Sequence, residues 1–211
     1  MNVNEFIGIT VLLFALANPI GVIPIFLDFV QKLKSVHPKR IIIIAASTVA
    51  GFLIASALLG EQILTFFNVG LNDFRIAGGL LALFIAFEMF QACYGGFMQT
   101  IEEKAEAETE DHGIAVTPLA FPLLVGPAEM SIMITLSNDM PHLGDRISLI
   151  VSSLVASVLI ALILWMAVPI NRILGKTGIN VATRVIALVV ATIGIKFIMT
   201  GIRAELPGLS G

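Results

Sequence analysis

Two short stretches decide the fold of this chain: Ala17-Asn18-Pro19-Ile20-Gly21 and Val125-Gly126-Pro127-Ala128-Glu129. Each stretch places a proline near the middle of a long apolar segment, and the two prolines lie 108 residues apart. Because a proline in an apolar segment must be accommodated structurally, its recurrence at a fixed spacing indicates that one structural unit occurs twice.

The same offset relates other parts of the chain. Gly70-Leu71-Asn72 returns 108 residues later as Gly178-Ile179-Asn180, and Arg75 has a counterpart in Arg184 at an offset of 109. Each copy has room for three membrane spans. An odd number of spans makes the second copy enter the bilayer from the opposite side, so the pattern predicts an inverted-topology repeat, which is typical of transporters.

The composition indicates a membrane protein. Apolar residues make up 57 % of the chain and charged residues only 13 %, with a mean hydropathy of +0.99. Soluble domains usually carry about a quarter of charged residues, so a water-soluble fold is excluded. Segments long enough to cross about 30 Å of hydrocarbon as helices are Phe6–Asp28, Ile41–Leu59, Phe74–Tyr94, Ile114–Leu136, Ile147–Pro169 and Val181–Ile202.

These segments predict an all-α integral membrane protein with six transmembrane helices in two inverted three-helix repeats. Residues 1–97 form the first repeat, residues 98–113 an acidic cytoplasmic linker, and residues 114–211 the second repeat. The start, Met1 to Glu5, has no positive charge and the apolar run continues beyond Ala17, which argues against a cleaved signal peptide.

Basic residues predict the orientation. They gather in the loops after the first, third and fifth spans, as Lys32, Lys34, Lys39, Arg40, Lys104, Arg172 and Lys176. Because basic loops stay in the cytoplasm, both termini are expected outside, on the periplasmic face of the cell inner membrane.

Several kinds of function lack a sequence signal. His37, His112 and His142 fall in loops without partner ligands at metal spacing, and the lone Cys93 cannot form an intrachain disulfide. The chain contains no metalloprotease, serine-hydrolase or phosphate-loop motif. We therefore expect no metal site, no cofactor and no enzymatic activity. The net charge of −3 and the membrane setting argue against nucleic acid as a partner.

The chemistry that remains lies at the two prolines. Proline inside a helix removes a backbone hydrogen bond, and in lipid the freed polar groups need partners or a water-lined cavity. Asn18 and Gly21 flank Pro19, and Gly126 and Glu129 flank Pro127. Breaks at both positions would direct half-helix N-termini and carbonyl oxygens toward one central pocket, which suits the carboxylate and the ammonium of an amino acid. The alternative is that the prolines serve packing only.

Charged residues within the spans allow two interpretations. A carboxyl at Glu129 is costly near mid-membrane, so it is a candidate for taking up a coupling proton or sodium ion. The alternative is a neutral carboxyl that is hydrogen-bonded within the bundle. Residues nearer to the span ends are expected to be anchors or ion-pair partners, namely Asp73, Arg75, Glu88, Arg184 and Lys196.

Four runs of sequence resemble the MarC family of six-span inner-membrane proteins. They are Leu16 to Phe26, Phe74 to Gly79, Pro118 to Pro127 and Gly178 to Asn180, in this order. The resemblance covers nearly the whole chain and implies transport of small neutral amino acids, with glycine and alanine as typical substrates. This chain departs from the family pattern after Gly126-Pro127, where it has Ala128 and Glu129.

The prediction is a secondary transporter of small neutral amino acids that works by alternating access. The expected substrate-binding residues are Asn18, Pro19, Gly21, Gly126, Pro127 and Glu129. The alternative is a passive channel or a membrane-embedded interaction protein. The sequence leaves open the coupling ion, the direction of transport and whether copies assemble as a homo-oligomer.

Overall fold

Every regular element that the structure describes is a helix. The computed structural model describes residues 3–32, 37–91, 119–140 and 142–206. In chain order the helices are α1 Val3–Ala17, α2 Pro19–Lys32, α3 Pro38–Phe67, α4 Leu71–Gln91, the short π-helix η1 Leu119–Leu124, α7 Pro127–Asp139, α8 Leu143–Trp165 and α9 Ala167–Glu205. The all-α prediction is confirmed, and the predicted acidic linker, Cys93 and His112 lie outside the described residues.

The long helices support a protein that crosses the membrane several times. Three of them, α3, most of α8 and α9, are each long and apolar enough to span a bilayer. The pair α1 and α2, bent by 43° at its break, gives a fourth span if the two helices cross the bilayer together, and a re-entrant loop if they do not. The predicted third and fourth spans fall on α4 and on η1 with α7. By length and apolar character the described residues therefore give three or four candidate spans, and α7 has only 13 residues. The predicted third and fourth spans lie partly outside the described residues, so the six-span arrangement stays a prediction.

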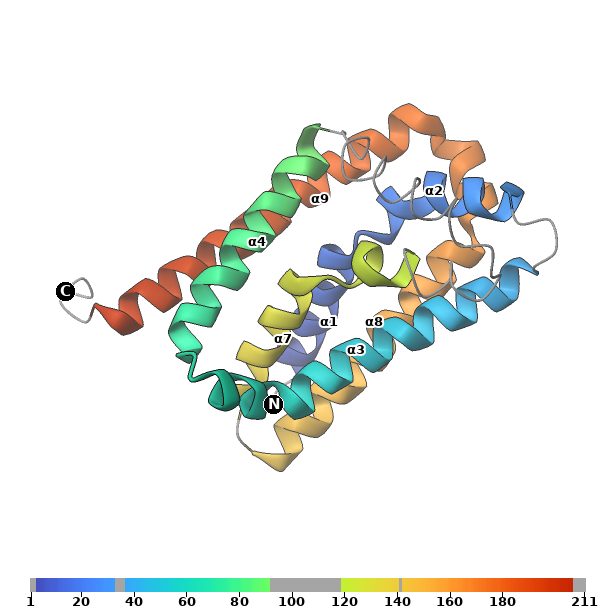
Figure 1. Cartoon of the computed structure of the whole chain (residues 1–211). Coiled ribbons are helices and arrows are strands. Elements are labelled where there is room, and N and C mark those ends of the chain that lie inside the picture. The colour runs from blue at the N-terminus through green and yellow to red at the C-terminus, as the bar shows by residue number, and fades with distance from the viewer. Residues whose placement is uncertain (1–2, 33–36, 92–118, 141, 207–211) are drawn as a thin grey trace.

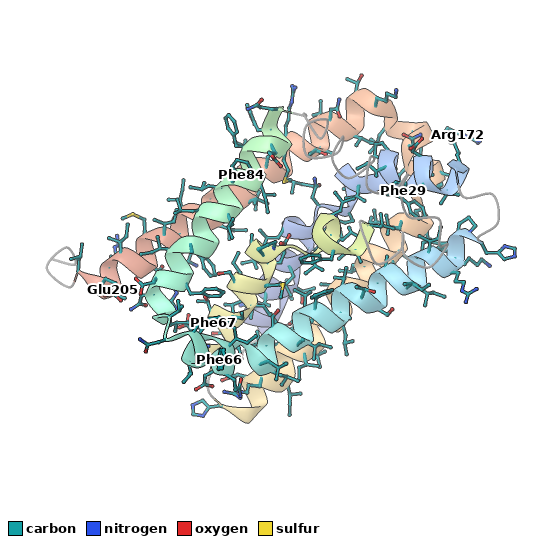
Figure 2. The ribbon with its side chains drawn as sticks, in the orientation of Figure 1. Phe29, Phe66, Phe67, Phe84, Arg172 and Glu205 are labelled. Atoms are coloured by element: carbon teal, nitrogen blue, oxygen red, sulfur yellow. The ribbon has the colours of Figure 1, made fainter. Side chains whose placement is uncertain are left out.

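The outer surface of the bundle is apolar, as lipid contact requires. Phe84 on α4, Val158 on α8 and Val185 on α9 have exposed fractions of 60 %, 66 % and 59 %. Figure 2 labels Phe84 on α4, and Phe66 and Phe67 at the end of α3. Side chains of this size would be unfavourable in such numbers against water and are favourable against hydrocarbon.

The helices form two long pairs with the broken segments between them (Figure 1). One pair is α4 with α9, and the other is α3 with α8. The segments α1, α2, η1 and α7 fill the space between the pairs. Their buried residues, among them Leu13, Ile23 and Leu124, join Val49 of α3 and Leu149 of α8 in the main hydrophobic core.

The predicted fifth loop is helical, which corrects the sequence analysis. Arg172 and Lys176 lie within α9, which begins at Ala167 directly after α8. Pro169 is tolerated because the first turn of a helix leaves its N–H groups unpaired. Gly175 then bends the helix with a φ of 58°, a conformation in which glycine has no steric penalty.

Glycines bring α4 and α9 into close backbone contact. A Cβ atom on Gly79 would lie 2.6 Å from the carbonyl oxygen of Gly194, and a Cβ atom on Gly194 would lie 2.8 Å from the carbonyl oxygen of Gly79. No side chain fits at this crossing without moving the backbone. Close approach through small residues is how helices gain packing energy in membranes, where hydrophobic burial between helices adds little.

Gly79→Ala should therefore destabilise the protein. Separating the two backbones is expected to cost about 1–3 kcal/mol, partly offset by the better helix propensity of alanine. The apparent melting temperature of the purified protein in detergent should fall by about 2–6 °C. Gly51→Ala on α3 is the control, because a Cβ atom there meets nothing within 4 Å, and it should leave the melting temperature equal or higher. Equal melting temperatures for the two variants would contradict the close contact.

Candidate functional site

The first helix break is at Asn18. Its N–H donates to the carbonyl oxygens of Phe14 and Ala15, both at 3.2 Å, and its φ of 40° ends α1. Asparagine tolerates this left-handed conformation better than most residues. Its Oδ1 accepts a hydrogen bond from the N–H of Gly21 at 3.4 Å, so Asn18 caps α2 and Pro19 is the first helical residue.

The second break has the same plan with the capping groups exchanged. Gly126 is extended, with φ −124° and ψ −174°, and Pro127 begins α7. Here the third helical residue supplies the cap, because Oε2 of Glu129 accepts a hydrogen bond from the N–H of Gly126 at 2.9 Å. Glu129 is only 4 % exposed. The hydrogen-bonded interpretation of Glu129 is thus present in the structure, and a role in ion coupling stays a prediction.

The prolines initiate half-helices instead of interrupting continuous ones, which corrects the mechanism expected from sequence. At the first helical position the missing proline N–H removes no hydrogen bond, because that group has no intrahelical partner. The helices they start are short: α2 has 14 residues and α7 has 13. At 1.5 Å per residue each is about 20 Å long, less than the roughly 30 Å of hydrocarbon in a bilayer.

A cavity lies at the start of α7. Its volume is about 240 Å³. Its walls come from four parts of the chain: Leu16 and Ala17 of α1, Leu81, Phe84, Ile85, Glu88 and Met89 of α4, Leu123 of η1, and residues 126–129 at the second break. Of the predicted site residues, Gly126, Pro127 and Glu129 line this cavity.

Asn18, Pro19 and Gly21 are not among the residues that line the cavity. The side chain of Asn18 faces the first turn of α2, and the residue is 2 % exposed. The cavity instead meets the first break through Ala17, the last residue of α1. The structure therefore brings one predicted half of the site together with the end of α1, and the substrate role of both halves stays a prediction.

Glu88, which was expected to be an anchor near a span end, also lines this cavity. It follows Leu81 and Ile85 at helical spacing, so all three share one face of α4 and line the same cavity. That periodicity was the available signal. Which face of α4 meets the cavity depends on how α7 packs, and spacing alone does not give this. The described residues hold no group of three or more His, Cys, Asp or Glu side chains suited to a metal ion.

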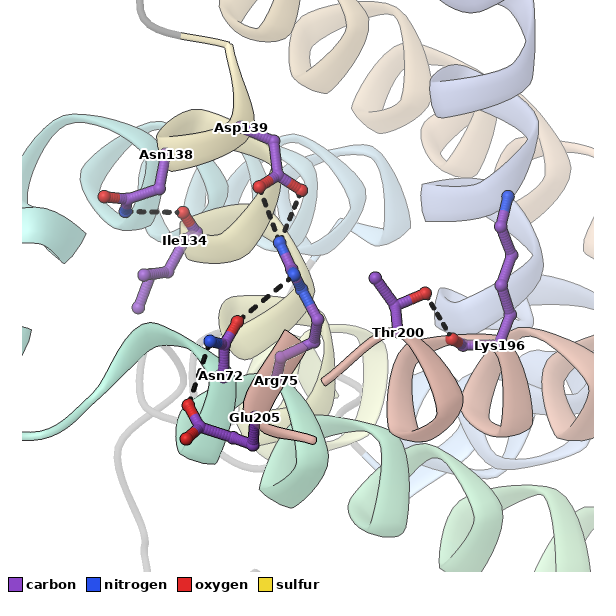
Figure 3. A network of polar contacts seen from close by, with 8 residues as sticks. All are labelled: Asn72, Arg75, Ile134, Asn138, Asp139, Lys196, Thr200 and Glu205. Carbon is purple, nitrogen blue, oxygen red and sulfur yellow. Dashed lines mark hydrogen bonds and ion pairs between the residues drawn. The ribbon is translucent and has the colours of Figure 1, made fainter. Parts of the chain in front are cut away.

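A network of polar contacts lies at the start of α4, at the end of this helix that is remote from the cavity (Figure 3). Nη2 of Arg75 donates to Oδ1 and Oδ2 of Asp139 at 2.5 and 2.6 Å, and Nη1 contacts Oδ1 of Asn72 at 3.5 Å. The amide of Asn72 donates to Glu205 at 2.9 Å. Arg75 is buried, with a side chain 8 % exposed, whereas Asp139 is half exposed. The prediction of Arg75 as a paired anchor is confirmed, and its partner Asp139 was not foreseen.

Contacts of this kind place several helix ends on one side of the bundle. The network joins the start of α4 to the ends of α7 and α9. Arg146 near the start of α8 pairs with Glu61 near the end of α3 at 3.3 Å. The cavity lies toward the other side, because its α4 residues run from Leu81 to Met89.

Comparison with known proteins assigns the family. The sequence profile of the MarC family integral membrane proteins matches residues 3–206. The chain belongs to the MarC family. This MarC protein is 39 % identical to the UPF0056 membrane protein BU267 of Buchnera aphidicola, over 98 % of this chain and 94 % of the relative. It is 38 % identical to the UPF0056 membrane protein YhcE of Escherichia coli, over 97 % and 93 %.

The family reaches into archaea. The UPF0056 membrane protein MJ1677 of Methanocaldococcus jannaschii is 31 % identical over 98 % of this chain and its own full length. The names of these three relatives describe membrane proteins and state no substrate. No solved structure matches the fold. The comparisons therefore give the family and the membrane setting, and the function has to be argued from the site.

Asp139→Asn should lower the stability of this MarC protein. The change leaves the buried Arg75 guanidinium without a charged partner, at a cost of about 1–3 kcal/mol, and the melting temperature in detergent should fall by about 2–6 °C. Glu61→Gln is the matched control, because it removes the acidic partner of an ion pair whose side chains are 34 % and 59 % exposed. An exposed pair contributes about 0–1 kcal/mol. Equal losses in the two variants would show that burial of Arg75 has no energetic consequence.

Proposed function

We propose that this MarC protein is a secondary transporter of small neutral amino acids, such as glycine or alanine, in the cell inner membrane. The observation that carries the proposal is the cavity at the start of α7, formed by segments from both halves of the chain. Half-helices that begin inside the membrane are the usual substrate-binding elements of inverted-repeat transporters, because their N-termini attract carboxylates.

The size of the cavity favours a small substrate. Sites for drug-sized ligands measure about 300–1,000 Å³, and this cavity, at about 240 Å³, is below that range. Its wall is largely aliphatic and aromatic, with backbone amides at the helix start and carboxyls as the polar groups. Such a wall suits a molecule with one carboxylate, one ammonium and a small apolar side chain.

The packing pattern supports two inverted repeats of three spans. Contacts between the halves come in matched sets: α3 packs on α8 and α4 on α9, α1 packs on α8 as η1 packs on α3, and α2 packs on α9 as α7 packs on α4. A pseudo-twofold axis in the membrane plane generates this exchange of partners. In the proposed mechanism the halves rock against each other around the cavity and expose it to one side at a time.

The coupling ion belongs to the same proposal. A proton or a sodium ion would drive accumulation, and Glu129 at the second break is the carboxyl that the sequence points to. Its bond to the N–H of Gly126 holds the carboxyl at the cavity wall. A change in its ionisation would therefore act directly on the start of α7.

Gly126→Leu should abolish transport. The added side chain projects from a buried residue of the cavity wall and fills space that the substrate needs. Counterflow of labelled alanine and glycine in proteoliposomes measures this, and the variant is expected to reach no more than about a tenth of the wild-type rate. Gly51→Leu, on an exposed part of α3 with open space around it, should transport normally.

The wild-type result tests the proposal itself. Exchange that saturates and accumulation against a concentration gradient support a secondary transporter. Exchange that saturates, but without substrate accumulation under any imposed proton or sodium gradient, contradicts ion coupling. Flux that never saturates indicates the channel alternative, and no flux of any small neutral amino acid contradicts transport of this class.

The proposed topology places both termini outside and residues 98–113 in the cytoplasm. It rests on the basic residues near the ends of the first, third and fifth predicted spans. An alkaline phosphatase fusion after Gly211 should be active, and a green fluorescent protein inserted within residues 102–111 should fluoresce. Cytoplasmic activity of a reporter at the C-terminus would contradict this orientation.

A further inference from the structure

Glu88 differs from the other carboxyl of the cavity. Glu129 is committed to the cap of α7 through its bond to Gly126. Glu88 is partly buried and lines the same cavity, but it forms no hydrogen bond or ion pair with any residue in the part of the chain that the structure describes. Its acceptor oxygens are therefore available to something that enters the cavity.

The register of α4 against α7 places Glu88 on the cavity side of the start of α7 and beyond it. Ser131 of α7 packs on Gly78, and its hydroxyl donates to the carbonyl oxygen of Phe74 at 3.1 Å. From this contact Glu88 lies about 15 Å along α4, and Pro127 lies about 6 Å back along α7. Helical side chains lean toward the N-terminus of their own helix, so the side chain of Glu88 leans back toward Pro127.

The surroundings of Glu88 strengthen its attraction for a positive charge. Leu81, Phe84, Ile85 and Met89 of α4 and Leu123 of η1 form apolar walls around it. Between such walls the effective dielectric constant is lower than in water, so a charge pair interacts more strongly. A cation that enters the cavity would meet a carboxylate whose charge no described residue balances.

We propose that Glu88 binds the ammonium group of the substrate in the cavity between α1, α4, η1 and α7. The inference rests on the proposed function and deepens it, because it names the group that distinguishes amino acids from simple carboxylic acids. The ammonium donates hydrogen bonds to the Glu88 carboxylate, and the substrate's own carboxylate points toward the first turn of α7. Sodium and other inorganic cations are alternative occupants that the test must separate.

Binding to the purified full-length protein in detergent tests this without relying on transport. L-alanine and methylammonium chloride should each raise the melting temperature of the wild type through Glu88, whereas sodium propionate and sodium chloride at the same concentration should cause no shift that depends on Glu88. Glu88→Gln should lose both shifts, and Glu88→Asp should keep part of them. Glu61→Gln, a change at the exposed end of α3, should respond like the wild type.

Other outcomes of the binding test overturn the proposal. Undiminished shifts with Glu88→Gln assign the ammonium to another group. A shift with sodium chloride that Glu88→Gln abolishes assigns Glu88 to an inorganic cation. The absence of any alanine or methylammonium shift in the wild type removes the site altogether. If Glu88→Gln does not fold, Glu88→Asp decides, and an undiminished methylammonium titration then counts against the proposal.

Exchange in proteoliposomes separates this inference from the proposed function. Glu88→Gln should raise the KM for alanine at least tenfold, and Glu61→Gln should not change it. Wild-type exchange with an unaltered KM in Glu88→Gln overturns the role of Glu88 and leaves transport standing. A wild type that binds alanine through Glu88 but exchanges none keeps the site and removes the transporter.

Discussion

The need to satisfy backbone polar groups inside the membrane governs this structure. A chain that breaks a helix in hydrocarbon leaves N–H and C=O groups that no water can reach. The protein meets this need twice, with Asn18 capping α2 and Glu129 capping α7. Because each cap stabilises a new helix start, the breaks are stable features, and the cavity can form beside one of them.

The rest of the bundle holds these half-helices in place. Close contact between Gly79 and Gly194 fixes α4 against α9, and the α3–α8 pair encloses the other side. Arg75 ties the end of α7 to the start of α4 through Asp139. Because this contact fixes the C-terminal end of α7, its first turn lies at a defined position on the cavity wall. Hydrophobic burial between helices contributes little inside a membrane, so close packing and a few polar contacts hold these helices together.

Two carboxyls with different environments share the cavity. Glu129 is buried and its carboxyl accepts a hydrogen bond from the N–H of Gly126, so it stabilises the start of α7. Glu88 has no such bond among the described residues and lies between apolar walls. Under the proposed function, Glu129 would shape the start of α7 and Glu88 would receive the positive charge of the substrate.

The sequence by itself determined the membrane setting, the helical class, the MarC family and the positions of both helix breaks, because composition, apolar run length and the Asn-Pro and Gly-Pro pairs are local signals. It did not determine how these half-helices are capped, by the side chain of Asn18 at the first break and by that of Glu129 at the second, since capping depends on side-chain geometry. It also missed the pairing of Arg75 with Asp139 and the place of Glu88 in the cavity. These contacts join residues far apart in the chain, and only the packing of α4 against α7 decides which of their side chains face each other.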